Sequence, residues 1–197
     1  GAKVLRRPGV VVEDLRVLPG RSGLAAMSMG GMAVATLVAP YAAGLAQGLI
    51  VLALAVHGVL AVLLARLLLS LPPEGRQANP TLHLGFVGFI VAGPAAMAVG
   101  WSGLATLLFW ATLPVAVVIW GLSAVQFTRA VPPPPLRPLL AIHVAPAALL
   151  SSVAALLGMV GLATGLALVG LLLAVALTVS ARWLLAAGVS PMWGALT

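Results

Sequence analysis

The sequence has no cysteine and very few charged side chains. Its 197 residues include ten Lys or Arg and three Asp or Glu, which is 7% charged residues, whereas soluble domains have roughly 25%. Without cysteine the chain can form no disulfide, no thiolate nucleophile and no cysteine metal site. So few charges cannot cover a water-exposed surface, and 62% of the residues are hydrophobic. The composition therefore excludes a soluble globular domain and predicts an all-α integral membrane protein.

The net charge of +7 does not indicate a nucleic-acid partner. The basic residues are spread over the ends of apolar stretches, and they form no basic stripe interleaved with aromatic residues. Cations beside a membrane are attracted to anionic lipid headgroups by about 1 kcal/mol each. The lipid bilayer is therefore the expected partner.

The charged residues fall into clusters separated by long uncharged stretches. Each stretch is long enough to cross a bilayer twice. If each forms a helical hairpin, all basic residues return to one side of the membrane, which the positive-inside rule makes cytoplasmic. We therefore predict a multi-pass protein of the cell (inner) membrane. The four clusters are Lys3, Arg6, Arg7, Glu13, Asp14, Arg16 and Arg21; Arg66, Glu74 and Arg76; Arg129 and Arg137; and Arg182.

Six apolar segments are long enough to be membrane helices. They form three parallel helical hairpin repeats, with a period of about sixty residues, within a transmembrane domain over 22–188. Proline-rich breaks separate these hairpins on the charged side. We predict a cytoplasmic basic segment over 1–21 and the start of a truncated further helix over 189–197. The predicted hairpins are 22–69, 81–128 and 139–185, with first helices at about 22–38, 81–99 and 139–157.

The two helices of each predicted hairpin differ in composition. The first helices are rich in Gly, Ala, Ser and Pro, whereas the second helices carry bulky runs such as 49–54, 63–69 and 171–177. Small residues let helix backbones approach closely, while lipid tails accept Leu and Val on every side. We therefore expect the first helices to form an inner ring and the second helices an outer ring that faces lipid.

Two prolines, Pro94 and Pro146, lie in the middle of two inner helices. Each frees a backbone carbonyl one turn earlier, and such backbone is tolerated at membrane depth where it faces protein or a watery cavity. Their recurrence favours kinked, pore-lining helices over simple packing kinks. The first inner helix has Gly30 and Gly31 but no central proline.

The interiors of the predicted spans contain no Asp, Glu, Lys or Arg, which argues against a carboxylate proton pump or a voltage sensor. His143 and Ser151 are eight positions apart, about 12 Å along a helix, so they cannot pair within it. Ser152 is one position further. We therefore expect no catalytic residue and no enzyme, although a serine from another helix beside His143 would revive that reading. No histidine pair has metal-ligand spacing, so no metal or cofactor is expected.

The three histidines have different predicted roles. His57 is expected to be a partnered packing residue, and His83 a solvated residue near the membrane interface. His143 is either a polar group that faces the pore or a residue that packs against a neighbouring helix. Arg129 and Arg137 would raise the local anion concentration at a cytoplasmic mouth, although membrane topology alone also explains them. A neutral lining with a basic mouth suits an anion.

The stretch PPPLRPLLAIHVAP, residues 133–146, resembles a segment typical of the tellurite-resistance/dicarboxylate transporter family, which includes the plant slow-type anion channels. Residues 79–81 and 86–88 are similar to the opening of the family's fifth helix. Residues 191–197 resemble the start of its ninth helix, and residues 3–21 are similar to the loop before its third. The similarity covers essentially the whole chain, in order.

The resemblance implies ten helices in five hairpins around a central pore, with subunits in a homotrimer. This chain is then an internal fragment with helices three to eight and the start of nine. In the family a phenylalanine on the ninth helix plugs the pore; either Leu196 stands at that point here, or the phenylalanine follows Thr197. The pore-lining candidates are Gly30, Gly31, Pro94, His143 and Pro146, with Arg137 at the mouth and Leu196 as gate.

The function that follows from the resemblance is an anion channel or passive carrier, which moves small inorganic anions or C4-dicarboxylates. The alternative is a non-conducting structural or assembly subunit of a membrane complex. A tightly packed interior between the inner helices would favour the alternative.

Overall fold

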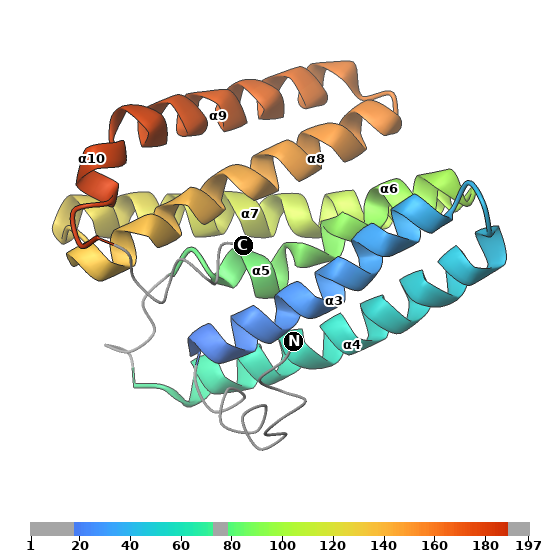
Figure 1. Ribbon diagram of the computed structural model, residues 1–197, viewed down its shortest axis with the longest axis horizontal. Coiled ribbons are helices and arrows are strands. Elements are labelled where there is room, and N and C mark those ends of the chain that lie inside the picture. The colour runs from blue at the N-terminus through green and yellow to red at the C-terminus, as the bar shows by residue number, and fades with distance from the viewer. Residues whose placement is uncertain (1–17, 73–78, 189–197) are drawn as a thin grey trace.

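The computed structural model describes residues 18–72 and 79–188, with side chains from Leu24 onward. These ranges are helical and contain no strand, as the composition predicted (Figure 1). The predictions for residues 1–17 and 189–197, including Leu196 as gate, lie outside the described residues. The elements are α3 (Leu18–Val38), α4 (Ala43–Ser70), α5 (Leu82–Phe86), the 3₁₀ helix η2 (Gly88–Val91), α6 (Ala92–Ala98), α7 (Ser102–Arg129), the 3₁₀ helix η3 (Pro134–His143), α8 (Val144–Leu156), α9 (Val160–Val179) and α10 (Ala181–Leu184).

Four helical spans are long and apolar enough to cross a membrane, judged by length and composition. They are Ala43–Ser70, Ser102–Arg129, Pro134–Leu156 and Val160–Val179. Two shorter apolar helices, Leu24–Val38 and Gly88–Ala98, accompany them. The spans indicate a multi-pass membrane protein, and the predicted all-α membrane class is confirmed at this level.

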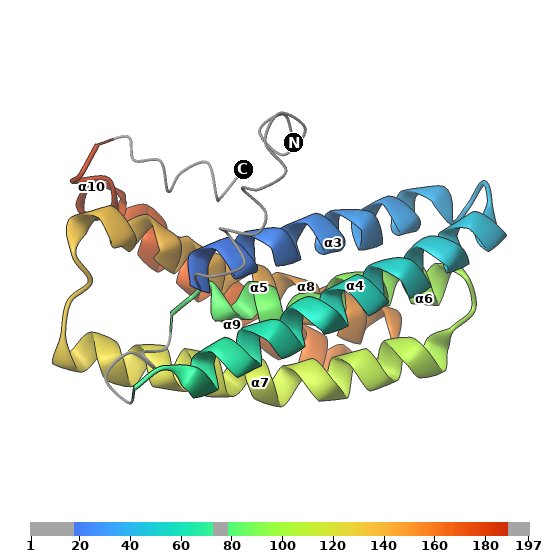
Figure 2. The same cartoon turned by 90° about the horizontal axis from the view of Figure 1, so that it is seen from below.

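The interrupted segment α5–η2–α6 lies at the centre of the bundle. It contacts α3, α4, α7 and α8, and Figure 2 shows it between α3 and α7. On either side of this segment, α3 runs beside α4 and α8 runs beside α9 (Figure 1). The centre of the structure is thus built from a helix rich in small residues, with long apolar helices around it.

Two glycines end helices at the short uncharged turns. Gly100 has φ +80° and Gly158 has φ +75°, a left-handed conformation that glycine adopts without steric cost. In each turn the next amide bonds back across the helix end: Trp101 N donates to Ala96 O, and Met159 N donates to Ala154 O. This is the Schellman C-cap, and it lets each chain reverse within a few residues.

The chain forms 3₁₀ turns ahead of both inner prolines. The segment η2 ends at Val91, before Pro94, and η3 ends at His143, before Pro146. A 3₁₀ turn bonds each amide to the carbonyl three residues earlier, so it adapts the backbone to a following residue that has no N–H. By contrast, Pro114 lies inside the continuous helix α7.

Close helix approach depends on small residues at the centre. A Cβ on Gly93 of α6 would lie 2.6 Å from Cγ2 of Val153 on α8, so the Val153 side chain packs directly against the backbone of α6. The surrounding helices instead expose bulky apolar side chains, as expected for a face toward lipid tails. Among these are Val51 and Leu52 on α4, Leu107 and Trp110 on α7, and Leu171 and Leu172 on α9.

Candidate functional site

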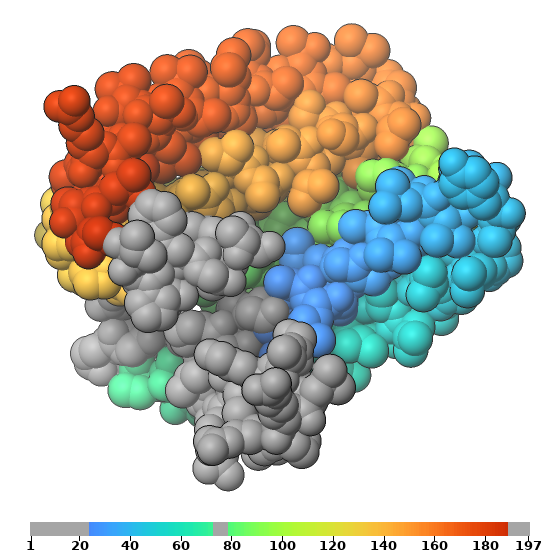
Figure 3. Space-filling model, viewed as in Figure 1, coloured from blue at the N-terminus to red at the C-terminus, as the bar shows by residue number. Residues whose placement is uncertain are grey.

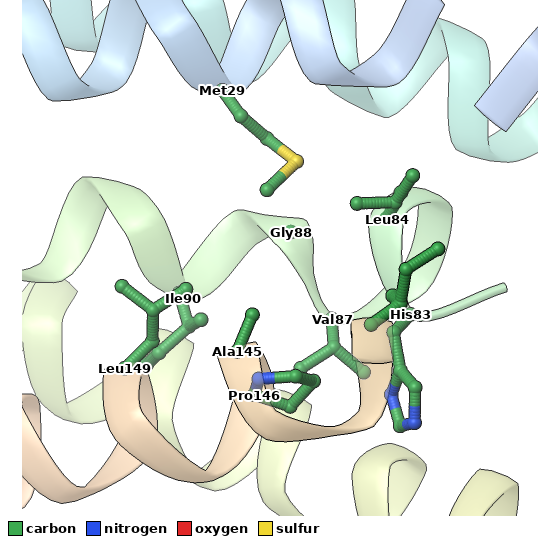
Figure 4. Close-up of a pocket in the computed structure, with 10 residues that line it drawn as sticks. Met29, His83, Leu84, Val87, Gly88, Ile90, Ala145, Pro146 and Leu149 are labelled. Carbon is green, nitrogen blue, oxygen red and sulfur yellow. The ribbon is translucent and has the colours of Figure 1, made fainter. Parts of the chain in front are cut away.

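An apolar hollow lies where the three helices rich in small residues meet. Its walls are Met29 from α3 and residues of α5–η2 and η3–α8 (Figure 4), and no residue of α4, α7 or α9 lines it. The volume open to a water molecule is about 20 Å³, enough for roughly one water. Figure 3 shows a depression between α3 and α8 with the α5–α6 region at its floor. The remaining lining residues are His83, Leu84, Val87, Gly88, Ile90, Ile142, Ala145, Pro146 and Leu149.

Of the predicted pore residues, Pro146 lines this hollow and is buried. His143 is also buried but does not line the hollow; it lies next to Ile142, which does. Pro94 is half-buried in α6, outside the hollow. The structure thus brings one of the two inner prolines to the hollow.

The two predicted glycines on α3 point in different directions. A Cβ on Gly31 would lie 3.4 Å from the Cβ of Ala53, so Gly31 faces α4. Gly30 is exposed, and a Cβ there would have no atom within 4 Å. On α3, the side chain that reaches the hollow is Met29.

The strongest polar feature is a pair of buried imidazoles beside the hollow. Nε2 of His83 lies 3.0 Å from Nδ1 of His143, with the ring planes nearly perpendicular. The indole N–H of Trp120, on α7, donates to the backbone oxygen of His143 at 3.2 Å. The pair therefore joins α5 to η3, and Trp120 fixes η3 against α7.

The outer nitrogen of His83 has no hydrogen-bond partner among the described residues. This atom, Nδ1, is buried, and the His83 side chain is 2% exposed. Figure 4 shows the ring on the side of the hollow away from Met29. A buried polar nitrogen without a partner costs about 1–3 kcal/mol, so this atom marks a place where the site is incomplete.

The prediction that His83 is solvated near the interface is wrong, because the side chain is buried against Trp120 and His143. The burial arises from tertiary packing of α5 against α7, which local sequence does not specify. One signal could have found the pair: His83 and His143 are 60 positions apart, close to the predicted repeat, so they occupy similar depths on neighbouring inner helices.

The third histidine, His57, is a packing residue that has a partner at Nδ1, while its Nε2 has none among the described residues. Nδ1 of His57 lies 2.8 Å from Oγ of Ser28, and Ser28 donates its one hydroxyl hydrogen to the Ala25 carbonyl. His57 is completely buried, and its ring meets the edge of Phe89 with centroids 4.4 Å apart. His57 does not line the hollow; it ties α4 to α3 and η2.

Arg137 is held by backbone carbonyls and an aromatic ring. Its Nε donates to the oxygen of Pro132 and its Nη1 to the oxygen of Trp183. The guanidinium carbon lies 4.4 Å from the centre of the Trp183 ring, a cation–π geometry. The half-buried side chain thus connects η3 to α10.

The serines of α8 are not placed for nucleophilic chemistry with His143. Oγ of Ser151 donates to the oxygen of Ala163 on α9, and Oγ of Ser152 donates to Ala148 within its own helix. The first bond joins two helices, as is common in membrane proteins, and the second is a bond to the carbonyl four residues earlier in α8. In the described ranges no three His, Asp or Glu side chains gather as a metal site would require.

Comparison of the chain with protein-family models, with curated proteins and with solved structures gave no match. The features of the chain that bear on its function are the hollow, the histidine pair and the charge distribution.

Proposed function

We propose that the chain forms part of a channel or passive carrier for small anions, of the tellurite-resistance/dicarboxylate transporter type. The observation that carries this proposal is the convergence of α3, α5–η2 and η3–α8 on one hollow. These are the helices whose small residues and prolines predicted an inner ring. Irregular backbone at membrane depth belongs where it faces protein or a cavity, and both 3₁₀ segments contribute to this lining.

The charge distribution supports an anion as the transported species. The hollow has no charged side chain. The described cations belong to the C-terminal parts of α4 and α7 and to η3 and α10, and these parts lie at one side of the bundle (Figure 1). Cations at one mouth attract anions over several ångströms, while a neutral lining does not trap them. The cations are Arg66, Arg129, Arg137 and Arg182.

The wider architecture is part of the same proposal. It comprises three parallel hairpins, within ten helices in five hairpins around a pore, and a homotrimer in the cell (inner) membrane. Two features support it: α3–α4 and α8–α9 each pack side by side, and the chain reverses at two identical glycine caps. Small inorganic anions and C4-dicarboxylates are the proposed substrates.

The hollow is too small for an anion in the conformation described, because it holds about one water. Passage therefore requires its walls to separate or a side chain to move. Met29 is the flexible side chain in the lining, since methionine has three rotatable bonds and adapts to gaps. The same small volume favours the second candidate, a non-conducting structural subunit.

Single cysteines test the proposed passage, because the chain has none of its own. Leu149→Cys places a thiol in the hollow, and Leu172→Cys places one on the exposed face of α9. In the full-length protein in liposomes, an anionic water-soluble thiol reagent is expected to modify the first and reduce anion flux. The second should be unreactive if it faces lipid. Failure of the reagent to reach Leu149→Cys in folded protein would favour the structural subunit.

A further inference from the structure

The histidine pair can exist in two neutral forms that differ in which ring donates. If Nε2 of His83 carries the shared hydrogen, Nδ1 of His83 is bare. If Nδ1 of His143 carries it, Nδ1 of His83 must hold the other hydrogen of its ring, and Nε2 of His143 is bare. One proton from water can be added to either form. Both additions give the same cation, in which Nδ1 of His83 is an N–H donor.

The described residues supply neither a hydrogen-bond acceptor nor a counter-ion for the resulting cation. Nδ1 of His83 has no acceptor among the described residues, and no described carboxylate faces the pair. The elements around the pair carry no acidic side chain in their described residues; their titratable or charged groups are histidines and arginines. The segments η2, α8, α9 and α3 from Leu24 onward carry no titratable or charged group. A buried charge without a counter-ion is costly. The groups are His57 and Arg66 on α4, Arg129 on α7, Arg137 on η3 and Arg182 on α10.

We propose that His83 and His143 form a joint binding site for one proton and one small monovalent anion, in the widened conformation of the hollow that passage also requires, since the described hollow holds about one water. The proton goes to the pair, and the anion accepts the hydrogen bond from Nδ1 of His83 and balances the charge. This inference rests on the proposed function for the identity of the ligand as an anion. Since each ligand removes the cost of the other, binding is reciprocal, and the bound state carries no net added charge.

Proton uptake on anion addition tests the site without any need for transport. The purified full-length protein in detergent, weakly buffered and with a pH indicator, is mixed with sodium nitrate. We expect about one proton per chain to be taken up, with nitrate affinity falling about tenfold for each unit rise in pH, as linkage of one proton to one anion requires. Nitrate binding without proton uptake, or no nitrate binding, would overturn the site.

The matched variant is the double substitution His83→Gln with His143→Asn. The amide groups can keep a hydrogen bond at the positions of the two ring nitrogens but cannot take up a proton. Proton uptake is expected to vanish in this variant and to persist in His57→Asn, which changes a buried histidine outside the hollow. Uptake that persists in the double variant would contradict the proposal.

A measurement on the unmodified protein keeps the proposal testable if the double variant does not fold. Nitrogen-15 NMR of labelled histidines reports ring protonation directly. The one added proton is expected to appear either as a single doubly protonated ring in the pair or, if the shared proton exchanges rapidly, as both ring signals shifted halfway. Unchanged signals at saturating nitrate would refute the site. Two outcomes distinguish this site from the proposed function. Proton-linked nitrate binding without anion flux in liposomes would contradict the proposed function but not the site. Anion flux without proton uptake would contradict the site but not the proposed function.

Discussion

Gly88 of η2 lies directly beneath the ring of His57 from α4. A Cβ on Gly88 would lie 2.7 Å from Cε1 of His57 and 2.9 Å from Sδ of Met29. The absence of a side chain at this one position therefore lets α3 and α4 approach the central segment together. It also places Met29 over the hollow that Gly88 helps to line.

Gly88→Ala is predicted to destabilise the protein by about 1–3 kcal/mol, because extra volume in a packed core forces neighbouring side chains away. Thermal unfolding of the detergent-solubilised protein measures the change. Gly48→Ala on α4 is the control: its added methyl group meets no atom within 4 Å, and alanine favours helix. An equal loss of stability in both variants would contradict the packing described for Gly88.

The bond between Ser28 and His57 predicts an energetic coupling between α3 and α4. Ser28→Ala leaves Nδ1 of His57 buried without its partner, at a cost of about 1–3 kcal/mol. His57→Leu removes the imidazole. The double variant is expected to be less destabilised than the sum of the single variants, by about 0.5–3 kcal/mol. Strict additivity in the unfolding measurements would mean that the bond does not form.

Met29→Ala is predicted to raise anion flux several-fold, because it removes the flexible side chain that narrows the proposed passage. Met27→Ala is the matched control on the same helix, since Met27 is 61% exposed and does not line the hollow. Flux into liposomes, normalised to protein content, is the measurement. If the two variants change flux equally, Met29 has no special role.

Two substitutions separate the charge of Arg137 from its contacts. Arg137→Glu is expected to reduce anion uptake several-fold, because it reverses the charge at the proposed mouth. Arg137→Lys keeps the charge but loses the planar fork that stacks on Trp183 and bonds to two carbonyls. It should lower the unfolding temperature while uptake persists. Unchanged uptake in Arg137→Glu would remove Arg137 from the transport mechanism.

The membrane class and the interrupted inner helices were predictable from composition and proline positions. A chain with so few charged residues must be surrounded largely by lipid and not by water. Proline has no N–H, so it interrupts the hydrogen bonds of its helix in any surroundings. The structure accordingly has four membrane-length apolar spans and 3₁₀ turns ahead of Pro94 and Pro146. Both are local or compositional properties, and they need no knowledge of tertiary contacts.

The polar contacts were less accessible to prediction, because they join residues far apart in sequence. His83 and His143 meet across 60 positions, and Ser28 meets His57 across 29. The direction of a side chain on an apolar helix is set by its neighbours when every face is hydrophobic. This explains why Gly31 could be placed on an inner helix but not assigned to the face toward Ala53.

Anion flux tests the central claim most directly. The full-length protein is reconstituted into liposomes at set membrane potentials, and the uptake of chloride, nitrate and malate is compared. The account predicts selective, potential-driven anion flux that Met29→Ala increases and that modification of Leu149→Cys blocks. Absence of flux for all three anions, from protein shown to be folded, would contradict the account and leave a non-conducting membrane subunit.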